Sequence, residues 1–91
     1  MGRSDIRLKH GIALLGRLDN ALGLYRFSYK GSHKVHVGVM AQEVRTVAPD
    51  AVMRGPDGYL RVDYERLGLR LQSWDEWVAA GRRILRGADA K

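Results

Sequence analysis

The stretch LYRFSYKGSHKVHVGV, residues 24–39, decides the fold that the sequence predicts. Residues 24–30 place three aromatic side chains at alternating positions, and residues 35–39 place three valines in the same way. Because successive side chains of a strand point to opposite faces, each run is typical of a β-strand with one apolar face. Gly31-Ser32-His33-Lys34 separates the runs with residues that favour turns. The stretch therefore predicts an antiparallel hairpin.

A second hairpin is predicted further along the chain. Ala51–Arg54 and Tyr59–Asp63 flank the sequence Gly55-Pro56-Asp57-Gly58. Glycine, proline and aspartate in this order are a strong turn signal. We therefore expect two short strands that pair across this turn.

The segment between the hairpins, residues 41–48, fits a short helix. Pro49 should end it, because the residue before a proline disfavours the helical conformation. The side chains expected to face inward are Ala41, Val44 and either Val47 or Ala48.

The two ends of the chain also suggest helices. Residues 5–24 carry apolar side chains near a helical period, although Gly11 and Gly16 weaken a helix. We expect an extended or irregular start, followed by a short helix that ends near Gly23 as a C-cap. The sequence thus predicts an α+β domain of antiparallel hairpins with short helices and a C-terminal helix.

That C-terminal helix is expected over about residues 70–86, with residues 87–91 as a frayed tail. Ser73 followed by Glu76 suggests that its main part begins with a capping box. The apolar seam could pack on the domain's own sheet or mediate self-association. The seam consists of Leu67, Leu71, Trp74, Val78 and Leu85, with Gly81 in the missing place.

Length and composition indicate one small domain. Ninety-one residues bury too little surface for high stability in a lone chain, so oligomerisation is a plausible remedy. The absence of cysteine excludes disulfides and thiolate metal sites. The net charge of +6 leaves binding to nucleic acid or an anionic surface as one functional alternative, although the basic residues are scattered. No apolar run could span a bilayer, and Met1-Gly2-Arg3 carries no signal-peptide pattern; a signal could have been removed from a longer precursor.

Ser4 and Lys9 are candidates for a nucleophile and its general base. A serine hydroxyl needs a base, and a lysine can be that base only when neutral. Its pKa must therefore fall by several units, through burial, for example in a trimer, or through a cation such as Arg7. Residues five apart meet only if the backbone bends between them, or if one comes from another subunit. The competing interpretation is a Ser4-Asp5 cap or turn with a solvated Lys9.

Other polar side chains have simpler explanations. His33 and His36, even with His10, lack carboxylates at metal-binding spacing, so we expect no metal site. We expect Gln42 to satisfy buried backbone groups and Glu43 to cap a helix or form a salt bridge. The Tyr64 hydroxyl is expected to bond within the core, and the pair Trp74 and Trp77 to pack in the core or an interface.

Three motifs together resemble a known family. They are Ser4-Asp5-x-Arg7-Leu8-Lys9, then Gly38-x-x-Ala41-Gln42-Glu43-Val44, then Asp57-Gly58-Tyr59-Leu60-x-Val62-Asp63-Tyr64. Their order and spacing are similar to those of the endosialidase-type intramolecular chaperones, or S74 peptidases, of phage tail spikes and tail fibres. Short bacterial proteins also carry this domain type. The resemblance extends from Ser4 to about Leu69.

The resemblance implies a trimeric chaperone that cleaves itself just before Ser4, with Lys9 as the base. The scissile bond would join Arg3 to Ser4, and no cofactor is implied. Residues 1–3 would be a leader or the remnant of an upstream fibre or spike segment, and 4–91 the chaperone domain with a motif-bearing core over 4–69. A non-cleaving assembly or interaction module of the same fold is the alternative. The setting would be phage assembly in a host cytoplasm, or export from a bacterium.

Overall fold

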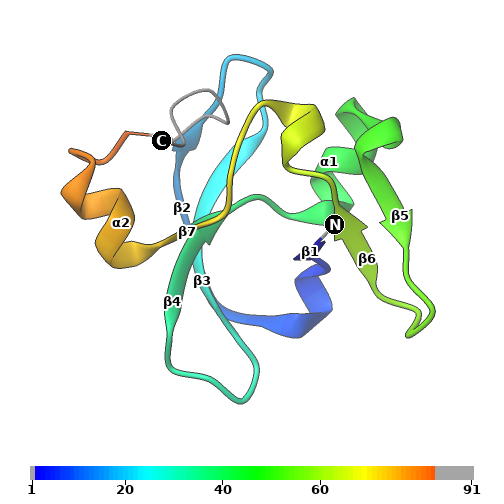
Figure 1. Ribbon diagram of the computed structural model, residues 1–91, viewed down its shortest axis with the longest axis horizontal. Helices are drawn as coiled ribbons and strands as arrows, with labels where there is room; N and C mark the ends of the chain where they lie inside the picture. Colours follow the sequence, from blue (N-terminus) through cyan, green and yellow to red (C-terminus); the bar gives the residue numbers. More distant parts are fainter. Residues whose placement is uncertain (1, 84–91) are drawn as a thin grey trace.

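The computed structural model describes residues 2–83, which form a small α+β domain with two antiparallel sheets and two helices (Figure 1). One sheet has the strand order β1-β6-β5, and the other has the order β2-β3-β4-β7. The first sheet contains β1 (Gly2–Arg3), β5 (Val52–Arg54) and β6 (Leu60–Val62). The second contains β2 (Lys9–Arg17), β3 (Gly23–Tyr29), β4 (Val35–Gly38) and β7 (Gln72–Ser73). The helices are α1 (Ala41–Val47) and α2 (Trp74–Ala79), and the single turns of 3₁₀ helix are η1 (Ile6–Leu8), η2 (Pro49–Ala51) and η3 (Glu65–Leu67).

Both predicted hairpins are confirmed. β3 and β4 pair in antiparallel fashion from Tyr25 opposite Gly38 to Ser28 opposite Val35. β5 and β6 pair around the predicted turn, in which Gly58 has a φ of 82°. A positive φ is strained for residues with a side chain, which explains the glycine at this position.

The helix expected before Gly23 is wrong. After η1 the chain enters β2, an edge strand that pairs with β3. Two register shifts interrupt this pairing, and Gly11 has a φ of 62°. These irregularities displace the apolar residues from a period of two, which is why the segment imitates a helical pattern. Gly23 begins β3 and does not cap a helix.

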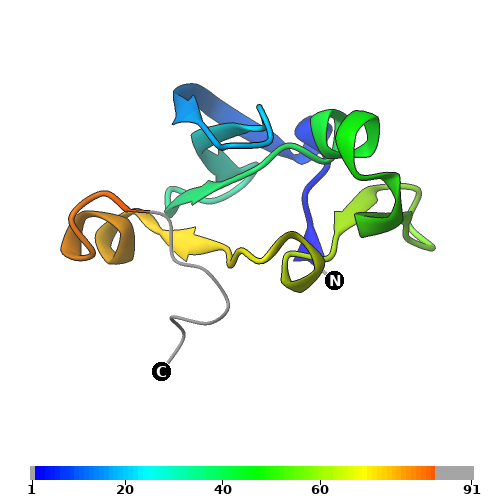
Figure 2. The ribbon, with the colours of Figure 1, turned by 90° about the horizontal axis from the view of Figure 1, so that it is seen from above.

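The buried apolar side chains form two clusters, one with residues of α1 and β6 and the other with residues of β3, β4 and α2. Figure 2 shows α1 and β6 in one half of the molecule and α2 in the other. The larger cluster lies between α1 and the β1-β6-β5 sheet, and Ala41 and Val44 face it as predicted. Ala48 packs against this cluster, whereas Val47 is 47% exposed. The smaller cluster joins the second sheet to α2 through Leu24, Val37 and Trp77. The segment that leads from β1 to η1 runs between these two halves.

The C-terminal helix is shorter than predicted. α2 begins at Trp74 and not near residue 70, because β7 and the capping box of Ser73 and Glu76 precede it. The capping box itself is confirmed. Leu67 lies in η3 and Leu71 outside any helix, so the heptad seam is not the face of one helix. Leu85 and the predicted frayed tail lie outside the described residues.

Within residues 2–83, none of the helices has the length and apolar character that crossing a membrane would require.

Candidate active site

The turn η1 brings Ser4 and Lys9 together within one chain. Asp5 caps this turn, because its side chain accepts a hydrogen bond from the Arg7 backbone N–H. Lys9 follows as the first residue of β2, and its Nζ lies 2.9 Å from the Ser4 Oγ. The bend that the sequence required between residues five apart is therefore this single 3₁₀ turn.

Lys9 is almost completely buried, with 4% of its surface exposed. Its Nζ reaches the Ser4 carbonyl at 3.0 Å and the Val39 carbonyl at 2.8 Å, and it lies 4.1 Å from the centre of the Phe27 ring. Burial lowers the pKa of Lys9 to about 7, and the Asp5 carboxylate acts weakly in the opposite direction. A substantial fraction of Lys9 is therefore a neutral amine near neutral pH.

The expected role of Arg7 as the cation that lowers this pKa is wrong. Arg7 forms an ion pair with Asp5, with 2.8 Å between Nη2 and Oδ2. Desolvation of Lys9 lowers its pKa, and burial within a single chain is sufficient for this desolvation.

Ser4 is also buried, and hydrogen bonds fix both its side-chain hydroxyl and its backbone carbonyl. Its Oγ donates a hydrogen bond to the Val39 carbonyl at 2.8 Å, and its own carbonyl accepts one from the Ala41 N–H at 2.9 Å. With Lys9 protonated, all three ammonium hydrogens have acceptors around Ser4 and Val39. When Lys9 is neutral, a rotation of the hydroxyl toward Nζ is enough to form the Ser–Lys hydrogen bond that general-base catalysis needs.

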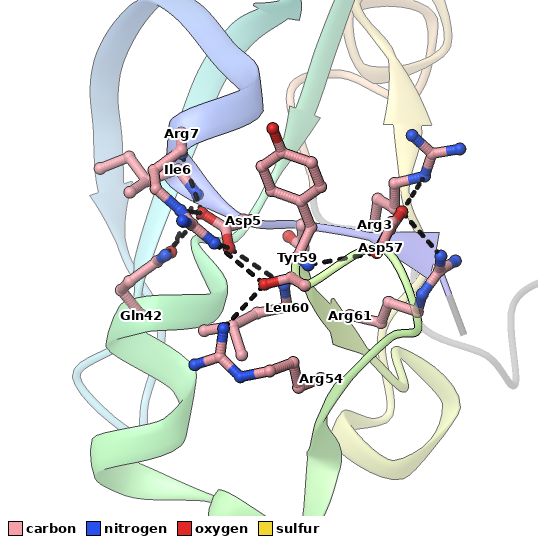
Figure 3. A network of polar contacts seen from close by, with 12 residues as sticks. Arg3, Asp5, Ile6, Arg7, Gln42, Arg54, Asp57, Tyr59, Leu60 and Arg61 are labelled. Carbon is pink, nitrogen blue, oxygen red and sulfur yellow. Dashed lines mark hydrogen bonds and ion pairs between the residues drawn. The ribbon is translucent and has the colours of Figure 1, made fainter.

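The three sequence motifs converge on the carboxylate of Asp5 (Figure 3). This side chain is 0% exposed and accepts hydrogen bonds from the Arg7 guanidinium of the first motif, from Gln42 Nε2 of the second at 2.7 Å and from the Leu60 N–H of the third at 3.0 Å. The Arg7 guanidinium, assisted by these other donors, holds the pKa of Asp5 far below its usual range. Asp5 therefore fixes the turn that joins Ser4 to Lys9.

The remaining polar residues of the second motif attach α1 to its surroundings. Gln42 Oε1 accepts the Ile6 N–H at 2.8 Å. Glu43 accepts bonds from the Gly23 N–H and the Tyr25 hydroxyl, and it pairs with Arg17 at 3.8 Å. Both side chains thus position segments next to the Ser–Lys pair and do not touch the pair itself.

The Tyr64 hydroxyl packs so closely against the backbone at Gly38 that only glycine fits at this position. The Tyr64 hydroxyl accepts the Val39 N–H at 3.1 Å, and a Cβ at position 38 would collide with that hydroxyl and with Leu71. Burial raises the pKa of Tyr64, so the hydroxyl stays protonated. The close approach fixes the backbone at Val39, whose carbonyl faces Ser4 and Lys9.

The turn of the third motif lies beside the residue that precedes Ser4. Asp57 accepts the Tyr59 N–H, the main cause that lowers its pKa, and forms ion pairs with Arg61 at 3.1 Å and Arg3 at 3.5 Å. The Gly58 carbonyl accepts a bond from the Arg7 side chain at 3.1 Å. Asp63 accepts the Arg66 N–H at the start of η3.

The Arg3–Ser4 peptide bond is held at both of its polar atoms. The Ser4 N–H donates to the Leu60 carbonyl at 3.0 Å, and the Arg3 carbonyl accepts a bond from the Tyr29 hydroxyl at 2.9 Å. Sequence reasoning missed Tyr29. Its only signal was its place as the last aromatic residue of the predicted strand.

His10 and His36 lie in strands β2 and β4 of the second sheet, and His33 lies in the connection between β3 and β4. His36 stacks on Phe27 with 5.9 Å between ring centres, and His10 Nε2 lies 3.3 Å from the Ser32 carbonyl. Within the described part of the chain, no group of three or more metal-ligating side chains is placed to hold an ion.

The fold and this site define a small α+β domain with a buried serine–lysine pair. Residues 4–53 match the family model of peptidase S74, described as chaperone of endosialidase. The match covers more than half of the chain and includes the first two motifs, so the chain belongs to this family and is an endosialidase-type chaperone domain. No curated protein and no solved structure matches the chain.

Proposed function

We propose that this protein is a tail-fibre-type intramolecular chaperone that cleaves itself between Arg3 and Ser4. The observation that carries the proposal is the 2.9 Å contact between Lys9 Nζ and Ser4 Oγ, both buried and both held by the family motifs. A lysine with a pKa of about 7 is suited to general-base catalysis at neutral pH.

The chemistry is an acyl shift followed by hydrolysis. Neutral Lys9 takes the Ser4 hydroxyl proton as Oγ attacks the carbonyl carbon of Arg3. The tetrahedral intermediate collapses as the bond from this carbon to the Ser4 nitrogen breaks, and the Lys9 ammonium returns the proton to that nitrogen. The product is an ester between Arg3 and the Ser4 oxygen. Water then cleaves the ester, leaving a carboxylate on Arg3 and a hydroxyl and free amine on Ser4.

The proposed working form is a homotrimer that assists the folding of an upstream fibre or spike segment. The supporting observation is that the edge strand β2 exposes Ile12 and Leu14, of which 37% and 52% of the surface is accessible. Apolar side chains on an unpaired edge favour association with another chain. Light scattering on the purified chain tests this part separately, and a monomer at all concentrations would contradict it.

The cleavage is tested by intact mass over time. We expect a product that begins at Ser4, and no product from the variants Ser4→Ala and Lys9→Met. Lys30→Met, which removes an exposed lysine, should cleave at the wild-type rate. Hydroxylamine should accelerate the release of residues 1–3, because it captures the ester.

Two results would contradict the mechanism. Cleavage that persists in Ser4→Ala would exclude Ser4 as the nucleophile. A wild-type chain that stays intact from pH 6 to 9 would favour the non-cleaving assembly module of the same fold.

A further inference from the structure

The Arg3 carbonyl lies at an edge of the β1-β6-β5 sheet. Arg3 pairs with Arg61, and Gly2 pairs with Val62. The Ser4 N–H bonds to the Leu60 carbonyl, so the hydrogen-bonded positions of this ladder are those of Gly2 and Ser4. Antiparallel ladders alternate hydrogen-bonded and non-hydrogen-bonded pairs. The polar groups of Arg3 therefore point away from β6, on the side where β1 has no further strand.

The ladder also stops at Ser4. A continuing ladder would direct the Leu60 N–H to the Ser4 carbonyl, but this N–H bonds to Asp5 Oδ2 at 3.0 Å. The Ser4 carbonyl turns to Ala41 and Lys9 instead. The chain thus leaves the sheet immediately after the Arg3–Ser4 bond, and the Arg3 carbonyl faces the other sheet.

Tyr29 of that other sheet donates its hydroxyl to the Arg3 carbonyl at 2.9 Å. Tyr29 is the direct cross-strand partner of Lys9 in the β2–β3 pairing. Its ring makes edge contacts with Phe27 at 5.4 Å and His36 at 5.2 Å between ring centres. The strand pair therefore places a proton acceptor and a hydrogen-bond donor side by side, one toward the Ser4 hydroxyl and the other toward the carbonyl before it.

We propose that Tyr29 is a catalytic residue that stabilises the oxyanion formed on the Arg3 carbonyl oxygen during self-cleavage. The inference rests on the proposed function. Negative charge develops on this oxygen in both tetrahedral intermediates, first when Ser4 attacks and again when water attacks the ester. A donor already in place on that oxygen strengthens its bond as the charge grows.

The protonation state of Tyr29 is consistent with this role. Burial raises the pKa of Tyr29 to about 12, with a smaller opposing effect of Arg3. The hydroxyl therefore remains a donor throughout the range in which Lys9, with its pKa of about 7, becomes a base. A purely structural role, in which the hydroxyl only satisfies an edge carbonyl, predicts a loss of stability without a specific loss of rate.

The test is the cleavage rate of Tyr29→Phe as a function of pH. The variant keeps the ring and removes only the donor, so we expect the plateau rate to fall by about 10²–10³-fold. The midpoint of the pH profile should stay where the wild-type chain has it, because Lys9 keeps its surroundings. Tyr25→Phe is the matched control: its hydroxyl, on the same strand, bonds to Glu43, and the plateau should stay at the wild-type rate.

A second variant keeps the test decisive if Tyr29→Phe folds poorly. Replacement of Tyr29 by 3-fluorotyrosine retains the ring and makes the hydroxyl a stronger donor, so the plateau rate should be at least that of wild type. A fall as large as that of Tyr29→Phe would overturn the inference.

The outcomes separate the inference from the proposed function. If the wild-type chain cleaves and Tyr29→Phe cleaves equally fast, or only with a shifted midpoint, the role of Tyr29 is excluded and the Ser4–Lys9 mechanism stands. If the wild-type chain does not cleave while Ser4→Ala behaves identically, both fall together.

Discussion

Asp5 and Gln72 are both buried planar polar groups, but their surroundings differ. Asp5, 0% exposed, accepts hydrogen bonds from Arg7, Gln42 and Leu60. Gln72 on β7 is 1% exposed, and within residues 2–83 neither its amide oxygen nor its nitrogen has a hydrogen-bond partner. Within the same residues, the buried Nε1 of Trp77 in the neighbouring helix α2 also has no hydrogen-bond partner.

In this small domain the specific hydrogen bonds of buried polar groups are concentrated around Asp5. Burial of a polar group is unfavourable unless hydrogen bonds compensate it. The segment around Asp5 meets this condition with donors from three motifs, and it orients Ser4 and Lys9 as a result. The segment from β7 to α2 attaches by the backbone pairing of β7 with β4 and by apolar contacts, and not by side-chain hydrogen bonds of Gln72 or Trp77. We therefore expect removal of the buried polar group to destabilise the domain at Asp5 and to stabilise it at Gln72.

The largest expected effect is at Lys9, whose burial should weaken the fold at neutral pH. Its pKa is about 7 in the folded chain, against an ordinary value of 10.5. Between these values the unfolded chain binds more protons, so wild-type stability rises with pH, by at most about 1.4 kcal/mol per pH unit. Lys9→Met lacks this dependence and should be more stable than wild type at pH 7, with a difference that shrinks toward pH 10.

Urea unfolding of both chains from pH 6 to 10 measures this difference. The carbonyls of Ser4 and Val39 keep other donors in the variant, so no acceptor is left unpaired. Lys30→Met is the control and should follow the wild-type curve. A difference that does not depend on pH would contradict the lowered pKa.

The second effect concerns Asp5. Asp5→Asn turns charge-assisted hydrogen bonds into neutral ones and places an amide N–H group among donors, so we expect a loss of about 1.5–3 kcal/mol in the free energy of unfolding. Because the Asp5 charge raises the pKa of Lys9, its loss should also move the midpoint of the cleavage profile to lower pH.

The control for Asp5 is Asp57→Asn. Asp57 forms similar ion pairs with Arg3 and Arg61, but 30% of its side chain is exposed. Exposed pairs contribute little to stability because water screens them. Equal effects of the two substitutions would show that the buried network around Asp5 has no special weight.

The third effect has the opposite sign. Gln72→Met replaces an unpaired amide by an apolar side chain of similar length, and we expect the free energy of unfolding to rise by about 1 kcal/mol. Gln42→Met is the matched control and should destabilise, because it removes the partners of Asp5 and the Ile6 N–H. Denaturant unfolding that gives both variants the same sign would contradict the comparison.

The smallest effect is at the capping box of α2. Ser73→Ala removes the acceptor of the Glu76 N–H and should cost about 0.5 kcal/mol, the low end for an N-cap, because the helix is short and largely exposed. Ser73→Asp retains an acceptor and should lie within a few tenths of a kcal/mol of wild type. Neither should alter the cleavage rate, since α2 packs on the far part of the second sheet. A Ser73→Ala chain that cleaves more slowly would couple the two regions.

Local patterns predicted much of the fold. The alternation of residues 24–39, the turn at Gly55–Gly58 and the capping box at Ser73 act within a few residues, and the structure contains all three. Residues 5–24 misled the same reasoning. Register shifts and a positive φ at Gly11 give an edge strand whose apolar spacing is nearly helical, and no local signal marks such irregularities.

For the site, the amino-acid sequence alone was enough to predict the residues of the proposed chemistry and the family to which the chain belongs. It named Ser4 and Lys9 and the condition that the backbone must bend between them. The folded chain was needed to show that η1 makes this bend, that burial and not Arg7 lowers the pKa of Lys9, and that Tyr29 reaches the Arg3 carbonyl. The reason is physical: burial and contacts between strands depend on residues distant in sequence, and no local pattern contains them.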